Sequence, residues 1–108
     1  MTASVKTSGS QTATVTTEHT LATVTDAGTY QLAVDVANLA GGDSVTLKIY
    51  GKARSSDTER EVYSATFAQP QTNNLKISIP VVSPHHLKAT LKQTTGTGRA
   101  FPWAIYEL

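Results

Sequence analysis

Alternation of apolar and polar residues is the feature that most limits how this chain can fold. From residue 30 to 36, and again from 45 to 49, every second residue is a large apolar one. Side chains of a β-strand point alternately to opposite faces, whereas a helix brings residues three or four positions apart onto one face. The alternation therefore predicts two half-buried strands. The residues expected toward the core are Tyr30, Leu32, Val34, Val36, Val45, Leu47 and Ile49.

Further short segments of the same kind are separated by turn-forming sequences. They cover residues 63–67, 75–81, 87–91 and 101–108, with weaker candidates near 13–15 and 21–24. Pro80 places the strand that contains it at a sheet edge, or ends it there. About seven or eight short strands, roughly ten residues apart, are typical of a β-sandwich or barrel. We expect an all-β, single-domain antiparallel sandwich or barrel of Greek-key or jelly-roll type.

The segment KARSSDTERE is predicted to be the tip of a hairpin formed by residues 45–68. If Ser56 and Asp57 lie at its centre, Lys52 faces Glu61 and Arg54 faces Glu59. This register puts the apolar residues of the two strands on opposite faces, because a slip of one residue inverts every side chain. A β-bulge at Gly51 would reconcile the two registers.

The hairpin has an alternative interpretation, in which no bulge is needed. Tyr50, Tyr63 and Phe67 would then share a second apolar face that is used for contact with another protein.

Residues 1–12 are rich in Thr, Ser and Gly and contain few apolar side chains. Such a segment buries too little apolar surface to offset the entropy lost on ordering. We expect a flexible N-terminal arm over 1–12, either a frayed terminus or an arm that orders on a partner, and a β domain over 13–108.

Composition excludes several classes of protein. A chain of 108 residues fits one domain, and a net charge of +1 does not suit a dedicated nucleic-acid binder. The absence of cysteine excludes disulfides, thiolate zinc sites and thiol nucleophiles. The sequence contains no run of about 18 apolar residues, the length that a membrane span needs, and its first residues do not resemble a secretory signal. We expect synthesis in a cytoplasm.

No constellation of residues predicts catalysis or cofactor binding. His85 and His86 follow Pro84 in a predicted turn, and adjacent positions of an extended chain point in opposite directions. The segment GGDSV lacks the partners of an esterase site, and GTGR lacks the second half of a phosphate-binding loop. We therefore expect no enzyme activity, metal or cofactor.

The last predicted strand is apolar on both faces. Phe101, Trp103 and Ile105 project to one side and form the expected core plug, while Tyr106 and Leu108 project to the other. A strand of a sandwich needs only one face for its core, so the second needs a cover from a subunit or a partner. In the alternative, the strand is central and covered by loops of its own chain.

Arg99 follows two glycines and can reach the carboxylate of a neighbouring protein, or remain solvated. The residues of the hypothetical oligomer or capsid interface are Arg99, Tyr106, Leu108, Tyr50 and Tyr63.

Three segments carry a resemblance to a known family. They are AGTYQLAVDVANLAGGDSVTLKIYGKARS, EVYSATFAQPQ and PVVSPHHLKATLKQTTGTGRAFPWAIYEL. Together they resemble small all-β virion proteins of tailed bacteriophages, the decoration or cement proteins of the capsid. The resemblance covers most of residues 20–108 and implies a sandwich or jelly-roll fold without enzyme activity. It also implies a homotrimer bound to the major capsid protein at capsomer junctions, on the outside of the virion.

Two other functions remain open at this point. The chain could be a tail or head–tail connector component, which would form a larger ring. It could also be a carbohydrate-binding or adhesin module, in which Trp103, Tyr50 and Tyr63 stack on sugar rings.

Overall fold

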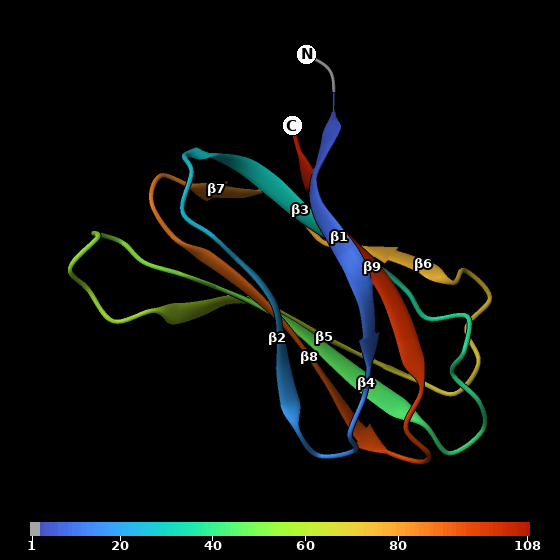
Figure 1. Cartoon of the computed structure of the whole chain (residues 1–108). Coiled ribbons are helices and arrows are strands. Elements are labelled where there is room, and N and C mark those ends of the chain that lie inside the picture. Colours follow the sequence, from blue (N-terminus) through green and yellow to red (C-terminus); the bar gives the residue numbers. More distant parts are fainter. Residues whose placement is uncertain (1–2) are drawn as a thin grey trace.

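Nine β-strands form two antiparallel sheets that face each other (Figure 1). The structure is a computed structural model and describes residues 3–108, in which no helix occurs. The prediction of an all-β, sandwich-like single domain is confirmed. The strands are β1 (Ser4–Thr12), β2 (Glu18–Val24), β3 (Gly28–Asp35), β4 (Ser44–Gly51), β5 (Arg60–Ala68), β6 (Leu75–Ile77), β7 (Val81–Ser83), β8 (Leu87–Thr95) and β9 (Ala100–Glu107).

The order of strands brings distant parts of the chain together. Sheet A has the order β1-β9-β3-β6, and β7 also pairs with β3; sheet B has the order β2-β8-β4-β5. The first and last strands are therefore neighbours, and both termini lie at the same end of the molecule (Figure 1). Strand β9 is central in sheet A because β1 covers one of its edges and β3 the other.

The core lies between the two sheets and follows the predicted alternation. Every residue assigned to the inner face of β3 and β4 is buried, and β8 and β9 add further aliphatic and aromatic side chains. Burying a large apolar side chain fully contributes roughly 1.5–3 kcal/mol. The largest fully buried apolar side chains are Tyr30, Leu32, Val34, Val36, Val45, Leu47, Ile49, Leu87, Leu91, Phe101 and Ile105.

The β4–β5 hairpin contains the expected bulge at a different position. Ile49 pairs with Tyr63, whereas Tyr50 pairs with Glu61, so Val62 is the extra residue and the bulge lies on β5. The prediction of a bulge at Gly51 is wrong in its site. The bulge keeps Tyr63 on the core side while the charged end of β5 returns to register.

The ion pairs predicted at the hairpin tip do not form. Glu61 lies 3.6 Å from the Nζ of Lys48, and Arg54 pairs locally with Asp57 at 2.9 Å. Glu59 instead bonds to side chains of the β7–β8 region, which sequence spacing within the hairpin could not indicate.

The predicted flexible arm differs from the structure over residues 4–12. These residues form β1, which pairs along β9 from Ser4 opposite Glu107 to Thr12 opposite Ala100. A strand at the edge of a sheet needs no continuous apolar face. The Ser and Thr residues of β1 therefore do not alternate with apolar ones, and no strand could be predicted from them. Residues 1–2 of the expected arm lie outside the described residues.

The predicted edge strand over 75–81 is divided into β6 and β7, and Pro80 lies just before β7. Leu75 and Ile77 face outward and are exposed, while Lys76 points inward and Val81 packs against the core. The Lys76 ammonium lies 4.9 Å from the centre of the Phe67 ring and covers the rim of the core. An inward-pointing charge also protects a sheet edge from pairing with other chains.

Candidate interaction surface

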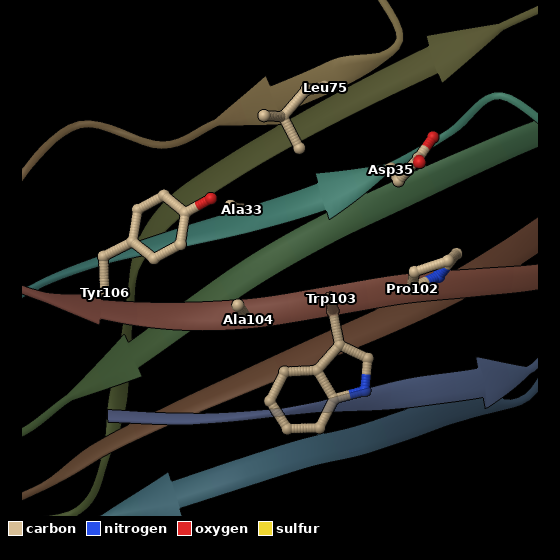
Figure 2. Close-up of a pocket in the computed structure, with 7 residues that line it drawn as sticks. All are labelled: Ala33, Asp35, Leu75, Pro102, Trp103, Ala104 and Tyr106. Carbon is tan, nitrogen blue, oxygen red and sulfur yellow. The ribbon is translucent and has the colours of Figure 1, made fainter. Parts of the chain in front are cut away.

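The two faces of β9 have different environments. Phe101 and Ile105 are fully buried between the sheets. Trp103 is only partly buried; its indole extends toward β1 (Figure 2), where a Cβ on Gly9 would lie 3.1 Å from its Cζ2 atom. Trp103 therefore fills the rim of the core beside a glycine, and Phe101, not Trp103, occupies the interior expected for the core plug.

The opposite side of β9 belongs to a surface on which apolar side chains lie among uncharged polar ones, including Ser8, Ser10, Thr29 and Gln31. Cross-strand pairing puts outward residues of β1, β9, β3, β6 and β7 on one side of the sheet, away from the core. We call this surface the outer face of sheet A. Its apolar residues are Val5, Ala33, Leu75, Ile77, Val82, Pro102, Ala104 and Tyr106.

Four of these side chains are large and well exposed. The exposed fractions are 59% for Val5, 53% for Leu75, 48% for Ile77 and 78% for Val82. Single exposed apolar residues are ordinary on protein surfaces, but a contiguous patch of them marks an interaction site.

The outer face is hollowed beside Tyr106 (Figure 2). A cavity of about 200 Å³ has Ala33 and Ala104 at its floor, with Tyr106, Leu75 and Pro102 around them. A second hollow, of about 230 Å³, lies on the β1 side between Val5 and Tyr106. Space is thus left on both sides of one aromatic ring, and Ala33 and Ala104 form the floor of the first hollow.

Charge is nearly absent from this face. Among the residues that the strand pairing of sheet A turns outward, Asp35 is the only one with a formal charge; Lys6, at the β1 bulge, has no pairing partner, and its ammonium donates to Asp26 at 2.6 Å. One of its oxygens accepts a hydrogen bond from the Ala37 backbone N–H at 2.9 Å. Depletion of charge around aromatic and aliphatic side chains is the composition of an interface centre.

The outer face of sheet B, by contrast, is covered by its own polar contacts. The Tyr50 hydroxyl donates to Glu18 Oε2 at 2.7 Å, and the Thr90 hydroxyl donates to the same oxygen at 2.6 Å. These bonds lower the pKa of Glu18, with the Thr90 bond contributing most. The pKa of Tyr50 is raised to about 12, mainly by the hydrogen bond that its hydroxyl donates to Glu18.

The remaining predicted contact residues lie in separate places. Tyr50 is further covered by the Lys88 ammonium, 4.8 Å from its ring centre, while Tyr63 packs against the core on the inner side of β5. Their alternative role as one shared apolar face with Phe67 is therefore wrong. Leu108 is half-buried after the end of β9, and its N–H donates to the Thr29 carbonyl at 2.9 Å.

Arg99 has a partner within its own chain. Its Nε donates to Asp43 Oδ2 at 2.7 Å, and the Asp43 side chain is almost fully buried. Asp43 also accepts from the N–H groups of Ala40 and Thr97, and these bonds, led by that of Arg99, lower its pKa. Arg99 thus forms an ion pair within its own chain, instead of reaching a neighbouring protein as expected from the sequence.

The ion pair fastens the β8–β9 loop to the β3–β4 loop. Gly96 adopts a φ of +92°, and a Cβ there would collide with the Asp43 carboxylate. The buried Gln93 amide donates to the Thr97 carbonyl at 2.7 Å and accepts from the Arg99 N–H at 3.0 Å. The segments GGDS and GTGR are thus structural, and they position the start of β9.

The histidines make local contacts. His86 Nε2 lies 2.7 Å from Glu59 Oε2, and His85 Nε2 lies 3.1 Å from the Lys52 carbonyl. Within residues 3–108, no group of three or more His, Cys, Asp or Glu side chains could hold a metal ion. The same residues include no helix with the length and hydropathy of a membrane span.

Comparisons of the chain with protein-family models, with curated proteins and with solved structures found no match.

Proposed function

We propose that this chain is a non-enzymatic virion structural protein that decorates a bacteriophage capsid. It binds the major capsid protein at capsomer junctions and stabilises the head. The resemblance of three sequence segments to decoration proteins suggests this function. The observation that supports it best is the outer face of sheet A, a nearly uncharged surface on which large apolar side chains are exposed.

The physical demands of this function match such a surface. A cement protein works by binding the assembled shell and not the separated subunits, so mass action stabilises the shell. A ligand present at about 100 times its dissociation constant contributes about 2.7 kcal/mol per site. The binding surface must therefore stay uncovered before assembly without unfolding the protein that bears it.

In this proposal the chain acts as a homotrimer on the outer surface of the virion, after synthesis in the host cytoplasm. Its partners are copies of itself and the major capsid protein, and it uses no cofactor, nucleic acid or membrane.

The adhesin function has less support from the geometry. Stacking on sugars needs aromatic faces that lie close together and are open to solvent. Trp103 lies at the core rim, Tyr63 packs on the inner side of β5, and Tyr50 is covered by Lys88 on the outer face of sheet B. No shared platform results.

The test first asks whether a major capsid gene neighbours the gene for this chain, and then uses empty heads assembled from that capsid protein. We expect purified protein to sediment with these heads and to raise the temperature at which they open. Heads that neither bind the protein nor gain thermal stability would contradict the proposal. Native mass measurement adds a second criterion: three copies favour decoration, whereas six or more favour a connector ring. Glycan binding that is lost in Trp103→Ala would favour the adhesin.

A further inference from the structure

We propose that the groove between the β4–β5 hairpin and β7 binds an extended segment of a partner protein, one in which an acidic side chain lies beside an aliphatic one. The site is separate from the hollow beside Tyr106. The inference goes beyond the proposed function and does not rest on it, because it holds whether or not the partner that supplies the segment is a capsid protein.

The groove lies at the flank of the sandwich where both sheets end. It has a volume of about 330 Å³ and lies beside the β4–β5 hairpin, whose tip extends beyond the other strands of sheet B (Figure 1). Among the strands that the structure describes, β5 pairs only with β4, and β7 pairs only with β3. Each of these two strands therefore has an unpaired edge. The groove is lined by Gly51, Lys52, Arg60, Val62, Val82 and His86, among others.

Apolar side chains are exposed on both sides of the groove. Val62 of β5 is 47% exposed, and Val82 of β7 is 78% exposed. Val62 is the extra residue of the β5 bulge, and bulges at sheet edges change the direction of side chains. Gly51 leaves room beside Val62, since a Cβ on Gly51 would lie 3.7 Å from both Val62 Cγ1 and the His86 carbonyl oxygen. An aliphatic side chain of the partner can fill this space and remove the valines from water.

Two cations at the groove have no carboxylate partner in the chain. Within residues 3–108, neither the Lys52 ammonium nor the Arg60 guanidinium forms an ion pair. The carboxylates of the hairpin are paired with other groups, namely Asp57 with Arg54, Glu59 with His86 and Lys88, and Glu61 with Lys48. Lys52 and Arg60 are therefore available to a carboxylate of the partner, which a guanidinium can bind through two parallel hydrogen bonds.

Contacts of the two adjacent histidines hold the hairpin beside the groove. His86 Nε2 lies 2.7 Å from Glu59 Oε2, and His85 Nε2 lies 3.1 Å from the Lys52 carbonyl oxygen. Both contacts join the hairpin to the segment between β7 and β8. A groove that is formed before the partner arrives binds it without the entropy cost of ordering a loop.

The unpaired strand edges favour a ligand in the extended conformation. A peptide that adds a strand to a sheet edge gains backbone hydrogen bonds, and its side chains provide specificity. A strand added beside β5 or β7 passes both the cations and the valines, so one short segment can satisfy both. A nucleic acid suits the site less well, because two cations neutralise few phosphates and valine offers no aromatic surface for stacking on bases.

The experiment measures binding of a labelled peptide to the full chain by fluorescence anisotropy at low salt. The probe is a short, end-capped peptide in which glutamate and valine alternate, and a second peptide has glutamine in place of every glutamate. Lys52→Gln and Arg60→Gln each remove one cation, and Gly51→Ala fills part of the groove at an ordinary contact distance. Lys92→Gln is the matched control, because Lys92 lies on the outer face of sheet B and also forms no ion pair among the described residues. Circular dichroism verifies the β fold of every variant.

We expect the glutamate peptide to bind with a dissociation constant in the high-micromolar range, since a groove of this size buries far less area than a standard interface. Lys52→Gln and Arg60→Gln should each weaken binding about two- to fivefold, the effect of an ion pair at a partly exposed site. Gly51→Ala should also weaken binding, whereas Lys92→Gln should not.

Several results would overturn the inference. These are no saturable binding up to millimolar protein, equal binding of the glutamine peptide, normal binding by folded Lys52→Gln and Arg60→Gln, or an equal loss in Lys92→Gln. Inorganic phosphate or a single-stranded oligonucleotide that displaces the peptide at the same concentration would likewise overturn it, because the site would then bind anions in general. Failure to bind capsids would contradict the proposed function alone.

Discussion

The outer faces of the two sheets show how one alternating pattern can give two different surfaces. In sheet B most outward residues of β2, β8 and β4 are charged or hydroxylic, and Glu18, Thr90 and Tyr50 bond to one another across these strands. In sheet A the outward residues are alanine, proline and aliphatic side chains around Tyr106, with uncharged Ser, Thr and Gln side chains among them. The inner faces of both sheets are apolar alike.

Burial of the core therefore does not determine whether the other side of a sheet is polar or apolar. Sheet B satisfies its polar groups within the chain and gains little by contact. Sheet A leaves apolar area in water, which favours contact with another surface. Variants on the two faces should therefore separate stability from association.

The largest expected effect is on the shared core and does not depend on either outer face. Phe101→Ala removes a fully buried ring and should lower the free energy of unfolding by about 3–5 kcal/mol. A small domain has about 5–15 kcal/mol in total. Urea denaturation measures the change, and Pro102→Ala, at an exposed position of the same strand, is the control. Trp103→Ala should be milder, since its indole is only partly buried; a larger loss for Trp103 than for Phe101 would contradict this order.

The next prediction compares the two outer faces by making the same substitution, tyrosine to alanine, on each of them. Tyr106→Ala should weaken self-association at least about tenfold, while the unfolding free energy of the separated subunit changes by less than about 1 kcal/mol. Tyr50→Ala, on sheet B, should leave association unchanged. Sedimentation equilibrium and urea denaturation measure the two quantities. The assignment of faces is reversed if Tyr50→Ala dissociates the oligomer and Tyr106→Ala does not.

The sequence predicts the parts of this fold that depend on local periodicity. The strands around residues 30–36 and 45–49 were predictable because large side chains alternate with small or polar ones, and the structure buries the large set. The two-sided apolar character of β9 was visible for the same reason. Tyr106 could therefore be proposed as a contact residue before its neighbours were known.

Features that depend on pairing between distant segments were not predictable. Nothing near Arg99 indicates that Asp43, in another loop, is its partner. Leu75 and Ile77 alternate like core residues, but they face outward because the pairing of β6 with Ala33 and Asp35 turns Lys76 inward. The outer face of sheet A is assembled from five strands, and so its extent appears only in the folded sheet.

Salt should distinguish an apolar contact from a contact between charges. If sheet A carries the association, the dissociation constant should change by less than about threefold between low salt and 0.5 M sodium chloride, because salt mainly screens charge. Sulfate should strengthen association, since it favours burial of apolar surface. Sedimentation equilibrium in both salts measures this. Dissociation by sodium chloride would instead indicate the ionic groups of sheet B.

The smallest expected effect tests whether the sheet B face is satisfied internally. Tyr50 ionises with a pKa of about 12, because its protonated hydroxyl donates to Glu18 and a phenolate there would face a carboxylate. Since the folded pKa exceeds the ordinary value of 10, this bond stabilises the fold below pH 10 and is lost as the pH rises toward 12. Because the site is partly exposed, solvent screens part of this contribution.

The titration of Tyr50 is isolated as the difference in phenolate absorbance between the wild type and Tyr50→Phe. It is measured over the pH range in which circular dichroism still shows the folded state. Glu18→Gln should move the midpoint back toward 10, because the amide accepts the bond without carrying charge. Asp35→Asn, which changes the only charge on the outer face of sheet A, should leave the midpoint unchanged. If Glu18→Gln leaves the titration midpoint of Tyr50 unchanged, the Tyr50 hydroxyl does not bond to Glu18. The contrast between sheet B, whose polar groups bond within the chain, and sheet A then loses its strongest support.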